Sequence, residues 1–297
     1  MARGSVVVTT RRPAAMWAVS VACTLAVGCT APAGTTTPPV KRLNYAALGD
    51  SAAAAPGVPD RAEPLGCFKS THDYPSVLAR RLAPTSFADV TCSGATTADI
   101  TSQPQQTSQG PVPPQIDAIH ADTDLVSITI GGNDIGIATD AAQCRTSSLD
   151  TPLCSTKFVQ GGVDRLSVAI NQQAPAWAEM IDVIRGKAPN ARIVVVGYGT
   201  YVRPGGCFAE LQAHPQDADY FQSKIDEMDD KQKQIAAEKG IDYFDIRPLS
   251  QGHDVCAPPD DRYFEGFVVT HPAAPLHPNS FGAAAVGNAL ADYLGLR

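Results

Sequence analysis

The sequence predicts an α/β fold in which a mostly parallel, five-stranded sheet lies between layers of helices. The chain has 297 residues, enough for one sizeable domain with a buried core. Hydrophobic residues make up 44% of it and charged residues 18%, which is typical of globular proteins and excludes a wholly disordered chain. Short apolar runs alternate with segments of helical periodicity, and this alternation is typical of a parallel sheet.

Five short segments are expected to be strands. The fourth, Arg192–Val196, is almost continuously β-branched, as is typical of a strand buried on both faces. Pro175 is expected to interrupt or kink the predicted helix 163–187, within which it lies. The long loops at 52–73, 136–160, 201–216 and 248–276 are where a substrate pocket is expected. The predicted strands are 43–48, 88–91, 125–130, 192–196 and 241–245, and the predicted helices are 74–82, 114–119, 163–187, 218–239 and 279–294.

The N-terminal segment differs from the rest of the chain. Residues 1–28 carry three arginines and no acidic residue, followed by an apolar run of about 15 residues, which indicates an export signal. This run is shorter than the roughly 20 residues of a membrane-spanning helix. Ala26-Val27-Gly28-Cys29 favours a lipoprotein signal in which Cys29 is lipidated and tethers the protein to a membrane surface; the alternative is ordinary cleavage near Gly28 or Ala33. Residues 29–41 read as a Thr/Pro-rich linker and 42–297 as the folded domain.

Charge and cysteine content narrow the classes of function. The formal net charge is −7 and no Lys/Arg-rich run occurs, so nucleic acid is not an expected partner. No Cys-x-x-Cys pair or nucleotide-binding glycine motif is found, so neither a metal nor a cofactor is expected. Beyond the signal and Cys29, six cysteines remain, an even number that indicates three disulfides in an exported protein. Six cysteines allow 15 pairings, and chain order favours the local ones: Cys67–Cys92, Cys144–Cys154 and Cys207–Cys256.

Three of the predicted strands lead into small, polar turns. Because the carboxyl ends of parallel strands lie at one edge of a sheet, these turns should emerge together, and ligands bind at that edge. The turns are Gly49-Asp50-Ser51, Ser93-Gly94 and Gly131-Gly132-Asn133-Asp134. Ser51 is a candidate nucleophile, although Asp50-Ser51 could equally be a simple helix cap. Gly94 and Asn133 are candidate donors to an oxyanion, although the glycine-rich segment could equally be a tight turn.

A serine nucleophile needs a base, and histidine is the usual one. His277 is favoured, because it lies in His-Pro-Asn-Ser just before the last predicted helix and can face the edge that carries Ser51. His271 also precedes a proline but lacks the helix start, and His253 lies in a long loop. The six candidates are His72, His120, His214, His253, His271 and His277.

These motifs, in this order, resemble those of the SGNH/GDSL hydrolases, and the chain is similar to the secreted actinobacterial lipases and esterases of that family. Residues 110–118, Gly197-Tyr198-Gly199 and the six cysteines add to the likeness. The resemblance implies a flavodoxin-like three-layer α/β/α fold and the same three disulfides. It also implies Ser51 as nucleophile, His277 as base, and an oxyanion hole formed by Ser51, Gly94 and Asn133.

One position departs from the family pattern. The family usually has an aspartate three residues before the histidine, and this chain has Ala274. We expect the main-chain carbonyl of Ala274 to orient His277, in preference to a remote carboxylate such as Asp254 or Asp261. The catalytic pair is then a Ser–His dyad, with its imidazolium less stabilised than in a triad.

The sequence therefore predicts an exported, monomeric serine esterase or lipase, lipid-anchored in the cell envelope or secreted, that hydrolyses small carboxylic esters or lipids through an acyl-enzyme. An acyltransferase, or a deacylase of a cell-envelope glycan or glycolipid, is the alternative, since it would share the first half-reaction. A non-catalytic envelope binding protein ranks third, and its motivation is the missing aspartate.

Overall fold

The computed structural model describes residues 43–296. Its central sheet has the strand order β2-β1-β5-β8-β9, and every neighbouring pair is parallel. The predicted fold class is therefore confirmed. The predicted signal segment, Cys29 and the whole of the predicted linker lie outside the described residues. The strands are β1 (Asn44–Gly49), β2 (Ser86–Asp89), β5 (Leu125–Thr129), β8 (Arg192–Val196) and β9 (Asp242–Phe244).

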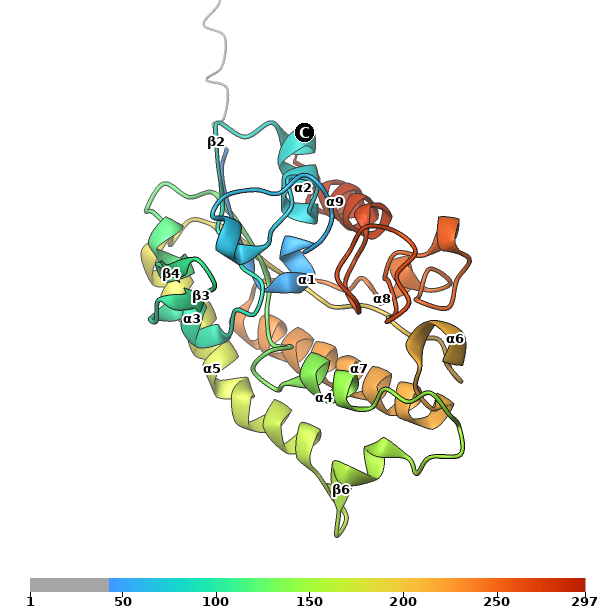
Figure 1. Ribbon diagram of the computed structural model, residues 1–297. Coiled ribbons are helices and arrows are strands. Elements are labelled where there is room, and N and C mark those ends of the chain that lie inside the picture. Colours follow the sequence, from blue (N-terminus) through green and yellow to red (C-terminus); the bar gives the residue numbers. More distant parts are fainter. Residues whose placement is uncertain (1–42, 297) are drawn as a thin grey trace, which may run out of the picture. The chain divides into compact units, whose positions relative to one another are not determined.

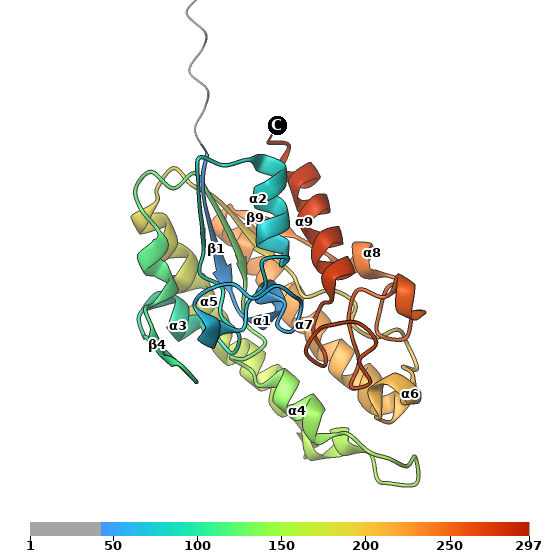
Figure 2. The same cartoon turned by 45° about the horizontal axis from the view of Figure 1, so that its top comes forward.

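Helices cover both faces of this sheet (Figures 1 and 2). Along β1, Tyr45 and Ala47 pack in one cluster with Leu78 and Leu290, while the alternate residues of the strand pack in a second cluster on the opposite face. In both views (Figures 1 and 2) α2 (Tyr74–Leu82) and α9 (Ser280–Leu294) lie on one side of the sheet, and α3 (Thr97–Thr101), α5 (Arg165–Lys187) and α7 (Pro215–Lys239) lie on the other.

The long loops contain only short elements. The short α-helices are α1 (Ser51–Ala54), α4 (Ile137–Gln143), α6 (Phe208–Leu211) and α8 (Arg247–Ser250). Single 3₁₀ turns are η1 (Leu65–Cys67), η2 (Gln115–Ala118), η3 (Cys154–Lys157) and η4 (Pro259–Asp261). Two hairpins pair β3 (Gln105–Thr107) with β4 (Gly110–Val112) and β6 (Val159–Gln160) with β7 (Val163–Asp164).

Two sequence-based expectations differ from the structure; of the two effects expected of Pro175, the interruption is wrong and the kink stays a prediction. Pro175 does not interrupt its helix, because α5 runs unbroken from Arg165 to Lys187. Ile170 and Trp177 are buried on either side of the proline, and this packing outweighs the lost backbone hydrogen bond. Residues 114–119 form the short 3₁₀ turn η2 and not an α-helix.

The three local disulfides are confirmed: Cys67–Cys92, Cys144–Cys154 and Cys207–Cys256. The first joins the loop after α1 to the segment just before Gly94. Between residues 43 and 296, no helix has both the length and the apolar character needed to cross a bilayer.

The strand order determines where a ligand can bind. The chain leaves β1 for β2 on one side and later returns to β5 on the other, so the order reverses between β1 and β5. In open parallel sheets, the crevice outside the carboxyl ends of two such strands is the usual binding site. Ser51 follows β1 and Asn133 follows β5, so both lie at this crevice.

Candidate active site

Ser51 is the first residue of α1, immediately after β1. Gly49 has φ +150°, and a Cβ there would lie 2.6 Å from the carbonyl oxygen of Thr129, so only glycine lets β1 turn this close to β5. Asp50 caps α1, because its carboxylate accepts the backbone N–H of Ala52 at 2.8 Å. The cap role considered for Asp50 is thus real, and it leaves both the hydroxyl and the N–H of Ser51 without a hydrogen-bond partner among residues 43–296.

Gly94 lies in the turn between β2 and α3, with φ +85°. The carbonyl oxygen of Ser93 accepts a hydrogen bond from Nε2 of Gln105 at 2.8 Å. In a trans peptide the N–H points away from the carbonyl, so the N–H of Gly94 is directed to the side opposite Gln105. No other described residue accepts a hydrogen bond from this N–H, which leaves it free to bind an anion.

Asn133 follows β5, and its carboxamide is held in place by the Gly94 loop. Its Nδ2 donates to the carbonyl oxygen of Ala95 at 2.9 Å. A carboxamide nitrogen carries two hydrogens. One hydrogen of Asn133 therefore fixes the orientation of the side chain, and the second is free to donate to a ligand.

His277 is oriented by a main-chain carbonyl, but not by the predicted one. Its Nδ1 lies 2.8 Å from the carbonyl oxygen of Pro275, whereas the carbonyl of Ala274 accepts the backbone N–H of His277 at 3.2 Å. The expectation for Ala274 was therefore wrong by one residue. The reason is a type II turn: Pro275 fixes the first central φ and Leu276 has φ +61°, which turns the Pro275 carbonyl away from the turn's own hydrogen bond.

This contact determines the protonation of the imidazole. A carbonyl only accepts hydrogen bonds, so Nδ1 of His277 carries the hydrogen and Nε2 keeps a free lone pair. Burial lowers the pKa of His277 below its ordinary value, and the bond to Pro275 opposes this shift. Neither remote carboxylate replaces the carbonyl: Asp254 is paired with Arg203 at 2.9 Å, and the Asp261 side chain makes no hydrogen bond or ion pair with His277.

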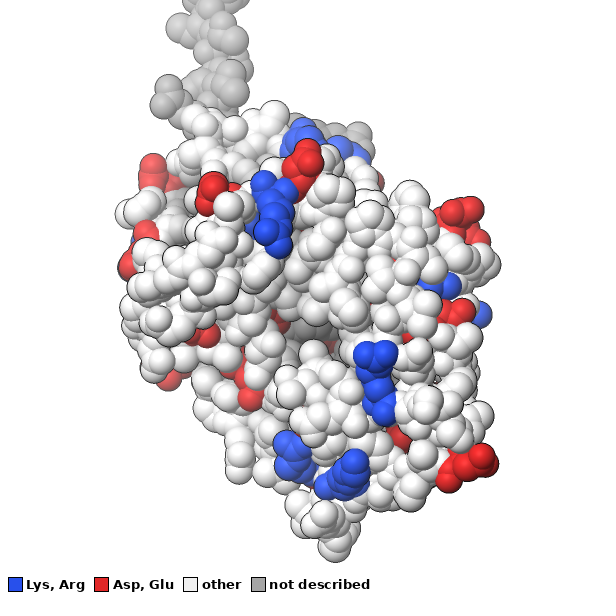
Figure 3. All heavy atoms as spheres, in the orientation of Figure 1, with Lys and Arg blue, Asp and Glu red and all other residues white. Residues whose placement is uncertain are grey.

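One cavity of about 110 Å³ brings three of the predicted residues together. Ser51, Asn133 and His277 line it, and of the six histidines, all within the described chain, only His277 does so. Gly94 does not line the cavity but lies on the adjoining turn. Figure 3 shows a hollow in this face between the positions of α1 and α4, with a mostly uncharged rim.

Ser51 and His277 are not hydrogen-bonded to each other in the described residues. Hydrogen bonds between catalytic groups are often long or poorly aligned until a ligand binds, so the shared cavity is the relevant observation. A hydroxyl, a neutral imidazole and several N–H donors around one space suit nucleophilic attack at a centre that develops negative charge.

Sequence reasoning missed Tyr198, which links the two loops. Its buried hydroxyl donates to the carboxylate of Asp50 and accepts the N–H of Gly132 at 2.9 Å. The tyrosine therefore connects the residue before Ser51 to the residue before Asn133. Burial raises the pKa of Asp50 to about 7, and the hydrogen bonds from Tyr198 and from the backbone of Ala52 oppose this shift. Only its position at the end of a predicted strand, in Gly197-Tyr198-Gly199, could have drawn attention to it.

Two further polar side chains hold these loops in place. Asp134 accepts the N–H and hydroxyl of Thr97 at 2.9 and 2.6 Å and the indole N–H of Trp177 at 3.1 Å, so it fastens the Asn133 turn to α3 and α5. Gln115 bonds to both the N–H and the carbonyl of Gly49, at 2.7 and 2.9 Å. No local sequence signal distinguishes these roles from ordinary polar loop residues.

The loop carrying His277 is braced by Glu265, a fully buried carboxylate. Its backbone pairs with the chain on both sides of the imidazole: the N–H of Glu265 donates to the carbonyl of His277, and its carbonyl accepts from Leu276, both at 3.0 Å. Its side chain accepts Nδ2 of Asn279 at 2.9 Å and the N–H of Thr270 at 2.7 Å. Asn279 in turn caps α9, so the final helix and the His277 loop share one anchor.

Comparison with known proteins gives a consistent result. The model of the GDSL-like lipase/acylhydrolase family matches residues 47–285. The chain is 33% identical to Lipase 2 of Streptomyces coelicolor over 94% of its own length and 95% of that protein. It is similar in structure to phospholipase A1 of Streptomyces albidoflavus NA297 (TM-score 0.69, 25% identity, 85% of this chain and 99% of that one). It is also similar to an extracellular lipase of Streptomyces rimosus (TM-score 0.68, 26% identity, with the same coverage).

Proposed function

Since the chain belongs to the GDSL-like lipase/acylhydrolase family and is a carboxylic ester hydrolase, we propose that it cleaves esters through an acyl-enzyme on Ser51, with His277 as the base. The observation that carries this proposal is the single cavity lined by Ser51, His277 and Asn133.

In the first half-reaction the hydroxyl of Ser51 attacks the ester carbonyl, and Nε2 of His277 takes its proton. Since Nδ1 of His277 donates to the Pro275 carbonyl, Nε2 is the nitrogen with a free lone pair. The imidazolium then gives the proton to the leaving alcohol. In the second half-reaction, His277 deprotonates a water, which attacks the acyl carbon and releases the acid.

The oxyanion formed in both halves is held by three donors: the N–H groups of Ser51 and Gly94 and the free carboxamide hydrogen of Asn133. None of these three hydrogens has an acceptor among the described residues. The other carboxamide hydrogen of Asn133 is bonded to the carbonyl of Ala95. Their orientation is set before substrate arrives, which is the property that makes such donors effective.

The imidazolium has no carboxylate partner. The Pro275 carbonyl fixes the tautomer but supplies no full charge, so the positive charge that forms during attack is stabilised less than in a Ser-His-Asp triad. The burial of His277 also destabilises the imidazolium, because burial favours the neutral imidazole and lowers its pKa. We therefore propose a dyad that depends strongly on its oxyanion donors.

The experiment compares the full chain with Ser51→Ala, His277→Ala and Asn133→Ala on a short-chain p-nitrophenyl ester. The first two variants should lose nearly all activity, and Asn133→Ala should lose about 100- to 1,000-fold in kcat. Wild-type protein, but not Ser51→Ala, should react with a fluorophosphonate probe. Retained activity in either Ser51→Ala or His277→Ala would contradict the assignment.

We also propose that the protein acts outside the cytoplasm, as a monomer, with Cys29 as an added lipid anchor. Three disulfides support the compartment, because disulfides persist in oxidising environments. Metabolic labelling with a fatty-acid analogue, compared between wild type and Cys29→Ala, tests the anchor, and gel filtration of the protein without residues 1–29 tests the monomer.

A further inference from the structure

The wall of the Ser51 cavity is mainly apolar. Ile137, Leu211 and Phe221 are among the side chains that line it, and these come from α4, α6 and α7. At about 110 Å³ the cavity is smaller than the ~150 Å³ of an engineered cavity that holds benzene. It therefore suits a short, unbranched chain of a few atoms attached to the reacting carbonyl.

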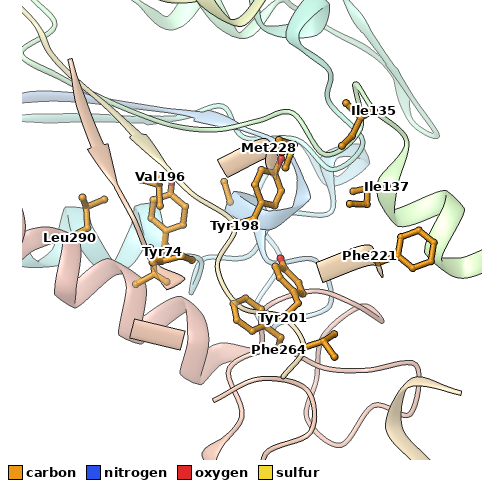
Figure 4. Packing of buried hydrophobic residues seen from close by; sticks show 14 of the residues in the cluster. Tyr74, Ile135, Ile137, Val196, Tyr198, Tyr201, Phe221, Met228, Phe264 and Leu290 are labelled. Carbon is orange, nitrogen blue, oxygen red and sulfur yellow. The ribbon is translucent and has the colours of Figure 1, made fainter. Parts of the chain in front are cut away.

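One hydroxyl group in this wall makes no hydrogen bond to any described residue. Tyr201 is 8% exposed and lines the cavity, and its hydroxyl has no hydrogen-bond partner among residues 43–296. Its ring is stacked on Phe264 with centroids 4.1 Å apart, which fixes the direction of the hydroxyl. In Figure 4 the oxygen of Tyr201 points toward the space between Tyr198, Ile137 and Phe221, all of which line the same cavity.

The hydroxyls of three other buried tyrosines are paired, whereas that of the partly exposed Tyr243 is also without a partner among residues 43–296. Tyr45 bonds to Ser127 at 2.7 Å, Tyr74 bonds to Thr129 at 3.0 Å, and Tyr198 is bonded twice. The Tyr201 hydroxyl is unpaired but not sealed off, because its oxygen is accessible from the cavity. A ligand that fills the cavity and displaces water from this hydroxyl must offer it an acceptor or leave it without a hydrogen bond.

We propose that the hydroxyl of Tyr201 hydrogen-bonds an oxygen atom carried by the substrate chain that enters this cavity, and so selects oxygen-bearing esters over purely alkyl ones. The proposal rests on the proposed function and adds a substrate class to it. An all-carbon chain would leave the hydroxyl unpaired in the filled, water-free cavity, whereas an ether or hydroxyl oxygen at that depth would pair with it. The oxygen can belong to the acyl group or to the alcohol group of the ester.

The test uses pairs of esters that differ by one oxygen in place of one methylene. For the acyl arm, p-nitrophenyl methoxyacetate is compared with the butyrate, and the 3-methoxypropionate with the pentanoate. For the alcohol arm, 2-methoxyethyl acetate is compared with butyl acetate. The ratio of kcat/KM within each pair is measured for wild type and for Tyr201→Phe. Dividing the two ratios cancels the difference in intrinsic reactivity between the esters.

Tyr201→Phe keeps the ring and its stacking on Phe264 and removes only the hydroxyl. In at least one arm, its ratio of oxygen-bearing to alkyl ester should fall about fivefold or more below the wild-type ratio, which corresponds to one hydrogen bond. Tyr45→Phe is the matched control: it removes a buried tyrosine hydroxyl that does not line the cavity, and its ratios should equal those of the wild type.

Ratios for Tyr201→Phe that stay within twofold of the wild type in both arms overturn the inference. That result would mean that the hydroxyl faces only water. A wild-type chain that hydrolyses none of the esters would instead contradict the proposed function. In that case calorimetric binding of the same ester pairs to Ser51→Ala, with and without Tyr201→Phe, tests the role of Tyr201 by itself, and equal affinities there also overturn it.

Discussion

Tyr198→Phe should destabilise the protein far more than the loss of one ordinary hydroxyl. The phenol is buried and makes two hydrogen bonds, donating to the Asp50 carboxylate and accepting the N–H of Gly132 at 2.9 Å. Phenylalanine fits the same space but removes both bonds. The carboxylate then loses a donor, and the N–H of Gly132 is left buried without an acceptor.

The size of the effect follows from these two losses. A hydrogen bond to a charged group contributes about 1.5–3 kcal/mol, and an unpaired buried N–H costs about 1–3 kcal/mol. We therefore expect the free energy of unfolding to fall by about 3 kcal/mol or more. Because the pKa of Asp50 is about 7, its carboxyl is mostly neutral at lower pH, so the loss should be smaller at about pH 5.5 than at about pH 8.5.

Urea denaturation at both pH values measures this, with Tyr45→Phe as the control. Tyr45 is equally buried, but its hydroxyl bonds only to that of Ser127, so its loss should cost about 1 kcal/mol at either pH. The kcat of Tyr198→Phe should also fall, because Asp50 and Gly132, which precede Ser51 and Asn133, are then no longer linked by hydrogen bonds to one hydroxyl. If the two variants are equally stable, or if the Tyr198→Phe effect does not change with pH, the reasoning about this link is refuted.

Three further outcomes are expected. Because burial lowers the pKa of His277, the acid limb of kcat/KM should have its midpoint below about 6.5, and a midpoint above 7 in a pH profile of ester hydrolysis would contradict this. Although burial opposes it, hydrogen bonds from Thr270 and Asn279 hold the pKa of Glu265 below its usual value, so its carboxylate stabilises the fold near neutral pH and this stability is lost as the pH falls below about 4.5. Glu265→Gln should therefore flatten the decline in unfolding free energy below about pH 4.5, which acid titrations followed by circular dichroism can show. Replacing Cys67 and Cys92 together by alanine should lower the free energy of unfolding by about 3 kcal/mol, since the bridge spans 25 residues; a calorimetric loss below about 1 kcal/mol would disagree.

The sheet could be predicted because its signal is local. The segment Arg192–Val196 is β-branched and continuous, and its observed bounds equal the predicted ones. The helix Tyr74–Leu82 also matches, since Asp73 caps it and an apolar face repeats along it. By contrast, Pro175 sits inside an unbroken helix, because burial of the residues around it outweighs its own preference.

The candidate site was predictable only in part, for a related reason. Ser51, Asn133 and His277 could be named because each follows a strand or precedes a helix at the edge where parallel strands end. The carbonyl that orients His277 was placed one residue too early. The choice between Ala274 and Pro275 depends on a turn conformation that the sequence pattern leaves open.

By itself the sequence determined the order of strands and helices, the family motifs and the residue types available for chemistry, since all of these lie in short stretches of chain. Tertiary structure alone decided the contacts that hold those residues in place. Tyr198 reaches Asp50 across 148 positions, and Gln115 reaches Gly49 across 66. Such partners meet only after the sheet has formed, because their pairing depends on the packing of whole elements and not on any local preference.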